Sequence, residues 1–216
     1  MTPGALWGIG AAVVGAIGVG VAVVLRSNDD EGTGGDDGGS GDDTAGVATV
    51  ATPLEVLSST HPQDIEALAR MIQSEEGGSS QERQVAVAWI CINEAAKEGR
   101  SVYALLTRPT GGYGHQGGGE GRNGYASTAS TALPSTQSLA QGIWAGRFPD
   151  PTGGALHFDS PRSQDYGIAH NLPGYHDKDG NPWTPERVAA KRRGEGFALA
   201  LLPGVDEYEF RMWRPA

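Results

Sequence analysis

Two stretches of the chain carry apolar residues at helical spacing. Positions i, i+3, i+4 and i+7 are apolar in both, which is the stripe of an amphipathic helix. The first stripe consists of Ile65, Leu68, Ala69 and Ile72, and the second of Val85, Ala88, Trp89 and Ile92. Two acids and two glycines, Glu75 to Gly78, lie between the stripes. The pattern therefore predicts that one helix ends near Glu75 and that a core helix follows the glycines.

Shorter patterns follow toward the C-terminus. Further helices are expected at residues 101–107, at residues 135–146, and from Pro185 with Thr184 as the N-cap. Residues 150–162 predict a turn that enters a short strand, and residues 197–202 and 208–215 predict a terminal hairpin. Together these elements predict an α+β fold that is mainly helical.

A longer apolar run, Leu6 to Leu25, lies near the start of the sequence and contains no charged residue. As a helix with a rise of about 1.5 Å per residue it would span roughly 30 Å, the thickness of the hydrocarbon core of a bilayer. No basic residue precedes the run and Arg26 follows it, which favours a single membrane anchor; a signal peptide is the alternative. The glycines of the run favour self-association through this helix.

Residues 27–52 separate the apolar run from the amphipathic helices. Between Ser27 and Thr44 there are seven acids and no base. This segment supplies −7 of the formal net charge of −10 of the whole chain. Such a segment, rich in Gly and Asp, predicts a flexible linker. The expected organisation is an anchor at 1–26, a linker at 27–52 and a folded domain at 53–216. The folded part has no basic stripe, so nucleic acid is not an expected partner.

The two acids at the predicted helix end are candidates for acid–base chemistry. Glu75 would lie at the negative end of the helix dipole, beside the like charge of Glu76, and packed against core helices. All three effects raise the pKa of a carboxyl group, as a general acid acting near neutral pH requires. The alternative is two solvated acids in a helix-ending turn, and spacing alone favours that alternative.

The residues around this helix end resemble the opening motif of the cell-wall hydrolase family of spore-cortex-lytic enzymes. The resemblance lies in residues 67–93, "ALARMIQSEEGGSSQERQVAVAWICIN", and in a second motif at residues 150–161, "DPTGGALHFDSP". The first motif is matched at Leu68, Ala69, Arg70, Ile72, Glu75, Gly78, Gln84, Val85, Ala86, Val87, Ala88 and Asn93. The resemblance covers a little under half of the chain, about residues 65–161.

This resemblance implies a lysozyme-like α+β domain that cleaves the bond between N-acetylmuramic acid and N-acetylglucosamine in peptidoglycan. It places the catalytic glutamate at Glu75. The chain departs from the family where Glu76 and Gly77 replace a small residue and a base, and where Glu94 replaces an arginine. Hydrolysis usually needs a second carboxylate, for which Asp159 and Glu120 are the candidates. A lytic transglycosylase needs only one, and we favour that outcome.

Several other residues are candidates for contact with the sugar. They are Gln84, His115, Gln116, Tyr125, Ser127, Thr128, His157 and Asp159. Five of them lie in or just after the glycine-rich segment 111–125, and loops of this length are often functional. Ordinary loop or turn positions are an equal alternative for these five. His157 and Phe158 alternate along the expected strand, so one is expected to face the cleft and the other the core.

A second polar cluster resembles the start of a calcium loop. It consists of Asp177, Asp179 and Asn181. The required glycine at the sixth position is replaced by Pro182, and the twelfth position is Val188 instead of glutamate. A turn is therefore expected here, as it is for Asp150 to Gly154, and no metal or cofactor is predicted.

Taken together, the sequence predicts a single-pass membrane protein whose folded domain faces the cell wall. Its expected substrate is the glycan strand of peptidoglycan, and its expected setting is bacterial wall remodelling, phage lysis or a virion protein acting during entry. The rival hypothesis is a non-catalytic, membrane-anchored module that binds peptidoglycan or another virion protein.

Overall fold

The computed structural model describes residues 52–58, 62–106, 132–172 and 174–216. The helices are α1 (Pro53–Ser58), α2 (Pro62–Glu76), α3 (Gln81–Lys97), α4 (Val102–Leu106), α5 (Pro134–Trp144), α6 (Pro161–Ala169) and α7 (Pro185–Gly194). The strands are β1 (His157–Asp159), β2 (Phe197–Ala200) and β3 (Arg211–Pro215). The expected mixture of helices with a smaller strand component is confirmed for these residues.

The three strands form one antiparallel sheet in the order β1-β3-β2. Phe158 pairs with Met212 in β1 and β3, and Leu199 pairs with Trp213 in β2 and β3. The predicted terminal hairpin is confirmed by the β2–β3 pairing. β3 is the central strand, so both of its edges are paired. Met212 and Trp213 point to opposite faces of the sheet and are both fully buried, so both faces of β3 are covered here.

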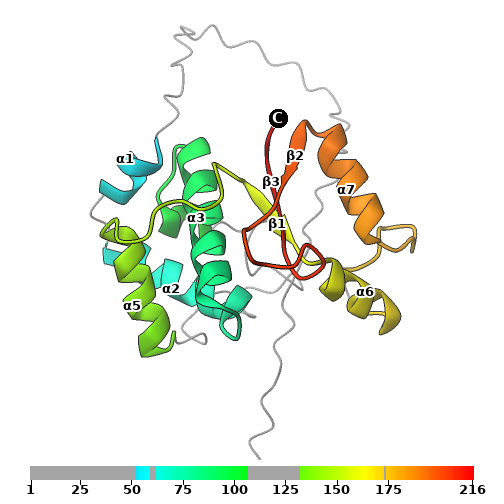
Figure 1. Ribbon diagram of the computed structural model, residues 1–216, viewed down its shortest axis with the longest axis horizontal. Coiled ribbons are helices and arrows are strands. Elements are labelled where there is room, and N and C mark those ends of the chain that lie inside the picture. Colours follow the sequence, from blue (N-terminus) through cyan, green and yellow to red (C-terminus); the bar gives the residue numbers. More distant parts are fainter. Residues whose placement is uncertain (1–51, 59–61, 107–131, 173) are drawn as a thin grey trace, which may run out of the picture.

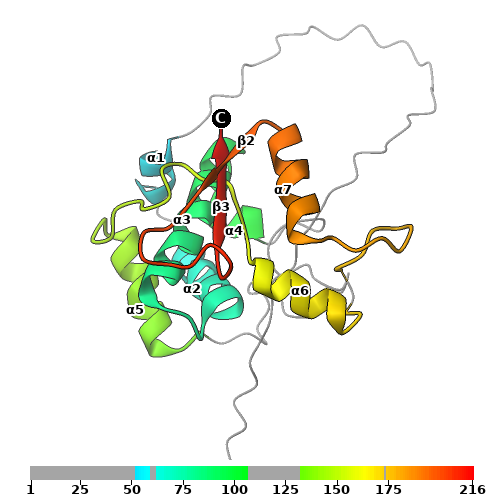
Figure 2. The same cartoon turned by 45° about the vertical axis from the view of Figure 1, so that its right-hand side comes forward.

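The sheet lies between two groups of helices. In Figure 1 and Figure 2, α1, α2, α3 and α5 lie on one side of it, and α6 and α7 lie on the other. Helix α7 packs along β2, while α3 approaches β1. The domain is therefore layered, with the amphipathic helices on one side of the sheet and the C-terminal helices on the other.

Helix α3 is the centre of the larger group of helices. Its residues from Val85 to Ala96 are buried, with only Glu94 partly exposed. A helix buried on all sides is surrounded by other elements, and α3 contacts α1, α2, α4 and α5. The second apolar stripe of the sequence is therefore part of a helix that is buried on all sides over most of its length, as the core prediction required.

Two helices were not expected from the sequence, α1 and α6. Helix α6 has a clear signal, because Ser160 is its N-cap and accepts a hydrogen bond from the Ser163 backbone N–H, with Pro161 in the first turn. The predicted cap of α7 is confirmed in the same way, because the Thr184 side chain accepts from the Arg187 backbone N–H. The apolar periodicity that revealed α2 and α3 is weaker in α6, since α6 buries only part of one face.

The predicted membrane anchor at Leu6–Leu25 and most of the predicted linker lie outside the described residues. None of the helices that the structure does describe is long and apolar enough to span a membrane.

Candidate functional site

The C-terminal end of α2 carries two buried carboxylates. Glu75 and Glu76 are 9% and 3% exposed. Glu75 follows Leu68 by seven positions and Ile72 by three, so it continues the apolar stripe of α2 and is turned toward the interior. The alternative of two solvated acids in a turn is therefore wrong. Helical spacing extended by one turn beyond Ile72 is the sequence signal for this burial.

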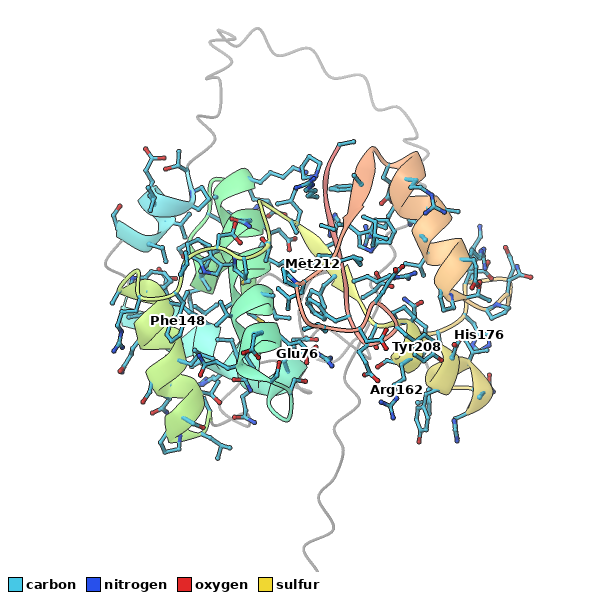
Figure 3. All side chains as sticks on the ribbon, viewed as in Figure 1. Glu76, Phe148, Arg162, His176, Tyr208 and Met212 are labelled. Atoms are coloured by element: carbon cyan, nitrogen blue, oxygen red, sulfur yellow. The ribbon has the colours of Figure 1, made fainter. Side chains whose placement is uncertain are left out.

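Glu76 has ionic and hydrogen-bonding partners of its own. The Nη2 atom of Arg83 lies 2.9 Å from each carboxylate oxygen of Glu76, and the Ser79 hydroxyl donates a hydrogen bond to the same carboxylate. A buried carboxylate is tolerated when it is paired and hydrogen-bonded in this manner. Figure 3 labels Glu76 at this helix end, near the C-terminal part of the chain. Glu76 therefore joins the end of α2 to the first turn of α3.

Gly77 is required by the path of the chain directly after these acids. A Cβ atom at Gly77 would lie 2.4 Å from the backbone oxygen of Gln73 and 2.2 Å from its side-chain amide nitrogen. The Gln73 side chain is itself held, since its Oε1 accepts a hydrogen bond from the Thr136 hydroxyl of α5 at 2.8 Å. The departure from the family pattern at Gly77 thus has a steric reason in this chain.

Tyr175 lies within electrostatic range of Glu75. Burial of its phenol raises the pKa of Tyr175, and the negative charge of Glu75 raises that pKa further. The ring packs directly on α6, where a Cβ at Gly167 would lie 2.5 Å from three of its ring carbons. Tyr175 comes from the segment between α6 and α7, outside the residues that resemble the family. Sequence reasoning did not find it, because no periodic pattern connects residues a hundred positions apart.

The two motif segments of the resemblance meet in space at Asn93. The Nδ2 atom of Asn93 lies 3.2 Å from both the Thr152 hydroxyl and the Ala155 backbone oxygen, and 3.3 Å from a carboxylate oxygen of Asp150. Asp150 also accepts hydrogen bonds from the backbone N–H groups of Thr152 and Gly154. The expected turn at Asp150 to Gly154 is therefore confirmed, and α3 holds it.

Asp159, proposed for contact with sugar or as a second carboxylate, is bonded inside the protein instead. It is 2% exposed. Its carboxylate pairs with Arg211 and accepts hydrogen bonds from the Trp213 indole at 2.5 Å and from the Gln164 amide at 3.0 Å. These contacts join β1 to β3 and α6. The expectation that Asp159 contacts substrate is corrected by this burial, and its position supports a structural role.

His157 also lies in a protein contact, on the side of β1 opposite to Phe158. Its ring meets Phe197 edge-on at 4.7 Å, whereas Phe158 stacks on Phe210 at 5.7 Å and packs on the core. Burial, together with the charges of Arg192 and Lys97, lowers the pKa of His157 to about 3. His157 is therefore neutral at physiological pH and packs against β2.

Gln84 has backbone partners at the same helix end. Its Nε2 atom donates to the backbone oxygen of Glu76 at 3.0 Å and lies 3.4 Å from that of Ser79. These bonds fix the turn between α2 and α3, so the structure gives Gln84 a positioning role. The remaining predicted contacts lie outside the described residues: His115, Gln116, Tyr125, Ser127 and Thr128, together with the candidate carboxylate Glu120.

The predicted turn at Asp177 is confirmed. The Asp177 carboxylate accepts hydrogen bonds from the backbone N–H groups of Asp179 and Asn181 at 2.9 and 2.8 Å, and pairs with Arg187 at 2.5 Å. Its acceptor oxygens thus serve the loop. Within the described parts of the chain, no three His, Cys, Asp or Glu side chains are grouped so that they could hold a metal ion.

Comparisons with protein-family models, with curated proteins and with solved structures found no match to this chain. The candidate site is defined by the residues at the end of α2 and by the contacts that surround them.

Proposed function

We propose that this protein cleaves the glycan strands of peptidoglycan between N-acetylmuramic acid and N-acetylglucosamine, with Glu75 as the general acid. The observation that carries the proposal is the burial of Glu75 at the C-terminal end of α2, one residue before a carboxylate that Arg83 neutralises. A buried carboxyl group at a helix C-terminus is in the environment that favours a proton donor. The likeness of residues 67–93 to a cell-wall hydrolase motif supplies the substrate class.

The proposed reaction begins with proton transfer from Glu75 to the glycosidic oxygen as the bond from that oxygen to the muramic acid C1 breaks. Two nucleophiles can then attack C1. In a lytic transglycosylase, the C6 hydroxyl of the same sugar attacks, its proton returns to Glu75, and an anhydro end forms. In a hydrolase, water attacks with the help of a second carboxylate. The internal bonding of Asp159 supports the single-acid route.

The tethered arrangement of the sequence fits this substrate. In the proposal, Leu6–Leu25 anchors the chain in a membrane and residues 27–52 let the folded domain reach polymer that lies close to that membrane. The arrangement suits a wall-remodelling enzyme of a bacterium as well as a phage lysis or entry protein.

The deciding experiment compares Glu75→Gln with Glu76→Gln on purified peptidoglycan. Glutamine keeps the shape of glutamate and cannot donate the proton, so Glu75→Gln is expected to lower the cleavage rate by about 10² or more. Glu76→Gln is the matched control, because it changes the adjacent carboxylate in the same manner and is expected to keep most of the activity. Circular dichroism of both variants checks that the fold is retained.

Mass analysis of the products then identifies the reaction. Anhydro-muramyl ends support a lytic transglycosylase, and reducing ends with an added water support a hydrolase. Equal cleavage by wild type and Glu75→Gln would overturn the assignment of the acid.

A non-catalytic wall-binding module is the second candidate. The observation that favours it is that Glu76 and Gly77 stand where the cell-wall hydrolase motif has a small residue and a base. In this chain Glu76 pairs with Arg83, and Gln73 occupies the space that a side chain at Gly77 would need. Wild-type protein that binds peptidoglycan and releases no fragments would support this candidate.

A further inference from the structure

Helix α6 and the turn at 206–209 together expose two tyrosines on one surface. Tyr166 of α6 is 47% exposed and Tyr208 of the turn is 48% exposed. The side chain of Arg162, one turn before Tyr166, is 66% exposed, and His170 follows Tyr166 by one turn. We call these four residues, Arg162, Tyr166, His170 and Tyr208, the α6 platform. Figure 3 labels Arg162 and Tyr208 close together at this end of the molecule.

The rings of the α6 platform are held in place by contacts with one another and with Asp165. The Tyr208 hydroxyl donates to the Asp165 carboxylate at 2.7 Å. Tyr166 stacks on His170 with ring centroids 4.0 Å apart, and the Nδ1 atom of His170 lies 2.8 Å from the Tyr166 backbone oxygen. The backbone N–H of Arg162 also donates to the Tyr208 backbone oxygen at 2.9 Å. Aromatic rings that are already ordered lose little conformational entropy when a ligand covers them.

Ion pairs connect the α6 platform with the end of α2. Arg162 lies 2.5 Å from one oxygen of Glu209, and the other oxygen of Glu209 lies 3.7 Å from Arg83. Arg83 is in turn paired with Glu76 at 2.9 Å. Two side chains, Glu209 and Arg83, thus connect the platform with Glu76, the residue next to the candidate acid.

The charge around the platform selects among polymeric ligands. Carboxylates surround the tyrosines, at Asp165 and at Asp206, Glu207 and Glu209 of the turn, while Arg162 is the platform's guanidinium. A polymer of phosphates would be repelled by this acidic surface. An uncharged sugar ring would not be, because its C–H face packs on an aromatic ring and its hydroxyl groups hydrogen-bond to carboxylates at its edge.

We propose that the α6 platform binds a peptidoglycan glycan strand, at sugars beyond those that Glu75 would cleave. The identity of this ligand rests on the proposed function. Tyr166 and Tyr208 stack on sugar rings, and the exposed guanidinium of Arg162 donates to an acetamido oxygen. The platform therefore contributes to retention on the long polymer and takes no part in proton transfer.

The test measures sedimentation of the full chain, in mild detergent, with insoluble purified peptidoglycan. All proteins carry Glu75→Gln so that the polymer stays intact. Adding Tyr166→Ala and Tyr208→Ala together is expected to weaken binding by about tenfold or more, since two aromatic contacts are lost. The matched pair Tyr166→Phe and Tyr208→Phe keeps the rings and is expected to bind within about threefold of the parent. Tyr103→Ala is the control, because Tyr103 is an exposed tyrosine on α4, outside the platform.

Cleavage by chains that retain Glu75 separates the platform from the proposed activity. If wild type cuts peptidoglycan and the alanine pair binds as well as its parent, the proposed binding by the α6 platform is wrong and the proposed cleavage is supported. If wild type does not cut and the alanine pair alone loses binding, binding by the platform is supported and the proposed cleavage is wrong. Equal loss of binding in the phenylalanine pair or in Tyr103→Ala would also overturn the platform, and a wild type that neither binds nor cuts would overturn both proposals.

Discussion

The end of α2 and the end of β1 both bury carboxylates, and they differ in what those carboxylates contact. At the end of β1, Asp159 is bonded to Arg211, Trp213 and Gln164, which come from β3 and α6. At the end of α2, two adjacent acids are buried together. Glu76 pairs with Arg83, while the charge of Glu75 acts on the phenol of Tyr175.

This difference shows that burial alone does not indicate function. A lone buried carboxylate with a guanidinium and an indole around it joins elements of the fold. At the end of α2, one of two adjacent carboxylates pairs with Arg83 and the other acts on the phenol of Tyr175. Glu75 is the carboxylate on which the proposed function rests, although Asp159 is the more buried.

The largest expected effect on stability is at Asp159. Asp159→Asn should lower the free energy of unfolding by about 3–5 kcal/mol, because Arg211 would remain buried without a counter-charge. Chemical denaturation measures this loss. Glu66→Gln is the control, since Glu66 pairs with Arg70 on an exposed face of α2 and should cost at most about 1 kcal/mol. Similar losses in the two variants would contradict the structural role of Asp159.

Glu76 should show a smaller loss of stability. Glu76→Gln keeps the shape of the side chain and can still accept from Ser79, but it removes the ion pair with Arg83. The free energy of unfolding should fall by about 1–3 kcal/mol. Arg83 retains Glu209 as a second partner, which limits the loss. An unchanged denaturation midpoint would show that the Glu76–Arg83 pair contributes nothing to the fold.

Asp177 is a third carboxylate for comparison, and it accepts hydrogen bonds from the backbone of its own loop. Its hydrogen bond with Arg187 holds the pKa of Asp177 well below its usual range. A carboxyl group with a depressed folded-state pKa contributes stability above its unfolded pKa, about 4, and that contribution disappears as the pH falls further. The melting temperature of Arg187→Gln should therefore lie below that of wild type at pH 7, and the gap should narrow at pH values below about 4. If the difference in melting temperature does not depend on pH, the loss of stability comes from the packing of Arg187 on Trp183. The guanidinium carbon of Arg187 lies 4.1 Å from the centroid of the Trp183 ring.

The smallest expected effect is a shift in a tyrosine titration. Because the charge of Glu75 raises the pKa of Tyr175, Glu75→Gln should lower the pKa of this phenol, and Glu76→Gln should leave it closer to the wild-type value. Ultraviolet difference titration against Tyr175→Phe isolates the signal from the other tyrosines. A Tyr175 titration that is identical in wild type and Glu75→Gln would show that the charge of Glu75 does not act on the Tyr175 phenol.

Periodic and local features of this chain were predictable from the sequence. The stripes of α2 and α3, the cap of α7 at Thr184 and the β2–β3 hairpin depend on residues close together in the chain, and they form as expected. Asp64 shows the limit of such reasoning. An acid in the first turn of α2 suits the helix dipole and an exposed position, yet Asp64 is fully buried and accepts a hydrogen bond from the Tyr103 backbone at the start of α4.

The candidate site was predictable only in part, because its partners are far apart in the sequence. The motif identified Glu75, but spacing gave no sign that Arg83 would neutralise Glu76 or that Tyr175 would approach Glu75. Asp159 was misassigned for the same reason. Its motif position suggested substrate contact, whereas its ionic partner Arg211 lies on a strand fifty-two residues later.

The strand order β1-β3-β2 has a consequence for the order in which the domain can assemble. The central strand, β3, is the last in chain order of the strands that the structure describes, and the pairing of Arg211 with Asp159 and of Glu209 with Arg83 must wait until this part of the chain has been made. Helices α2 and α3 can assemble earlier, since folding during synthesis begins with the N-terminal elements. A chain whose residues 206–216 have not yet been synthesised would therefore hold Glu75 and Glu76 in an incomplete domain, in which Asp159 lacks its guanidinium partner.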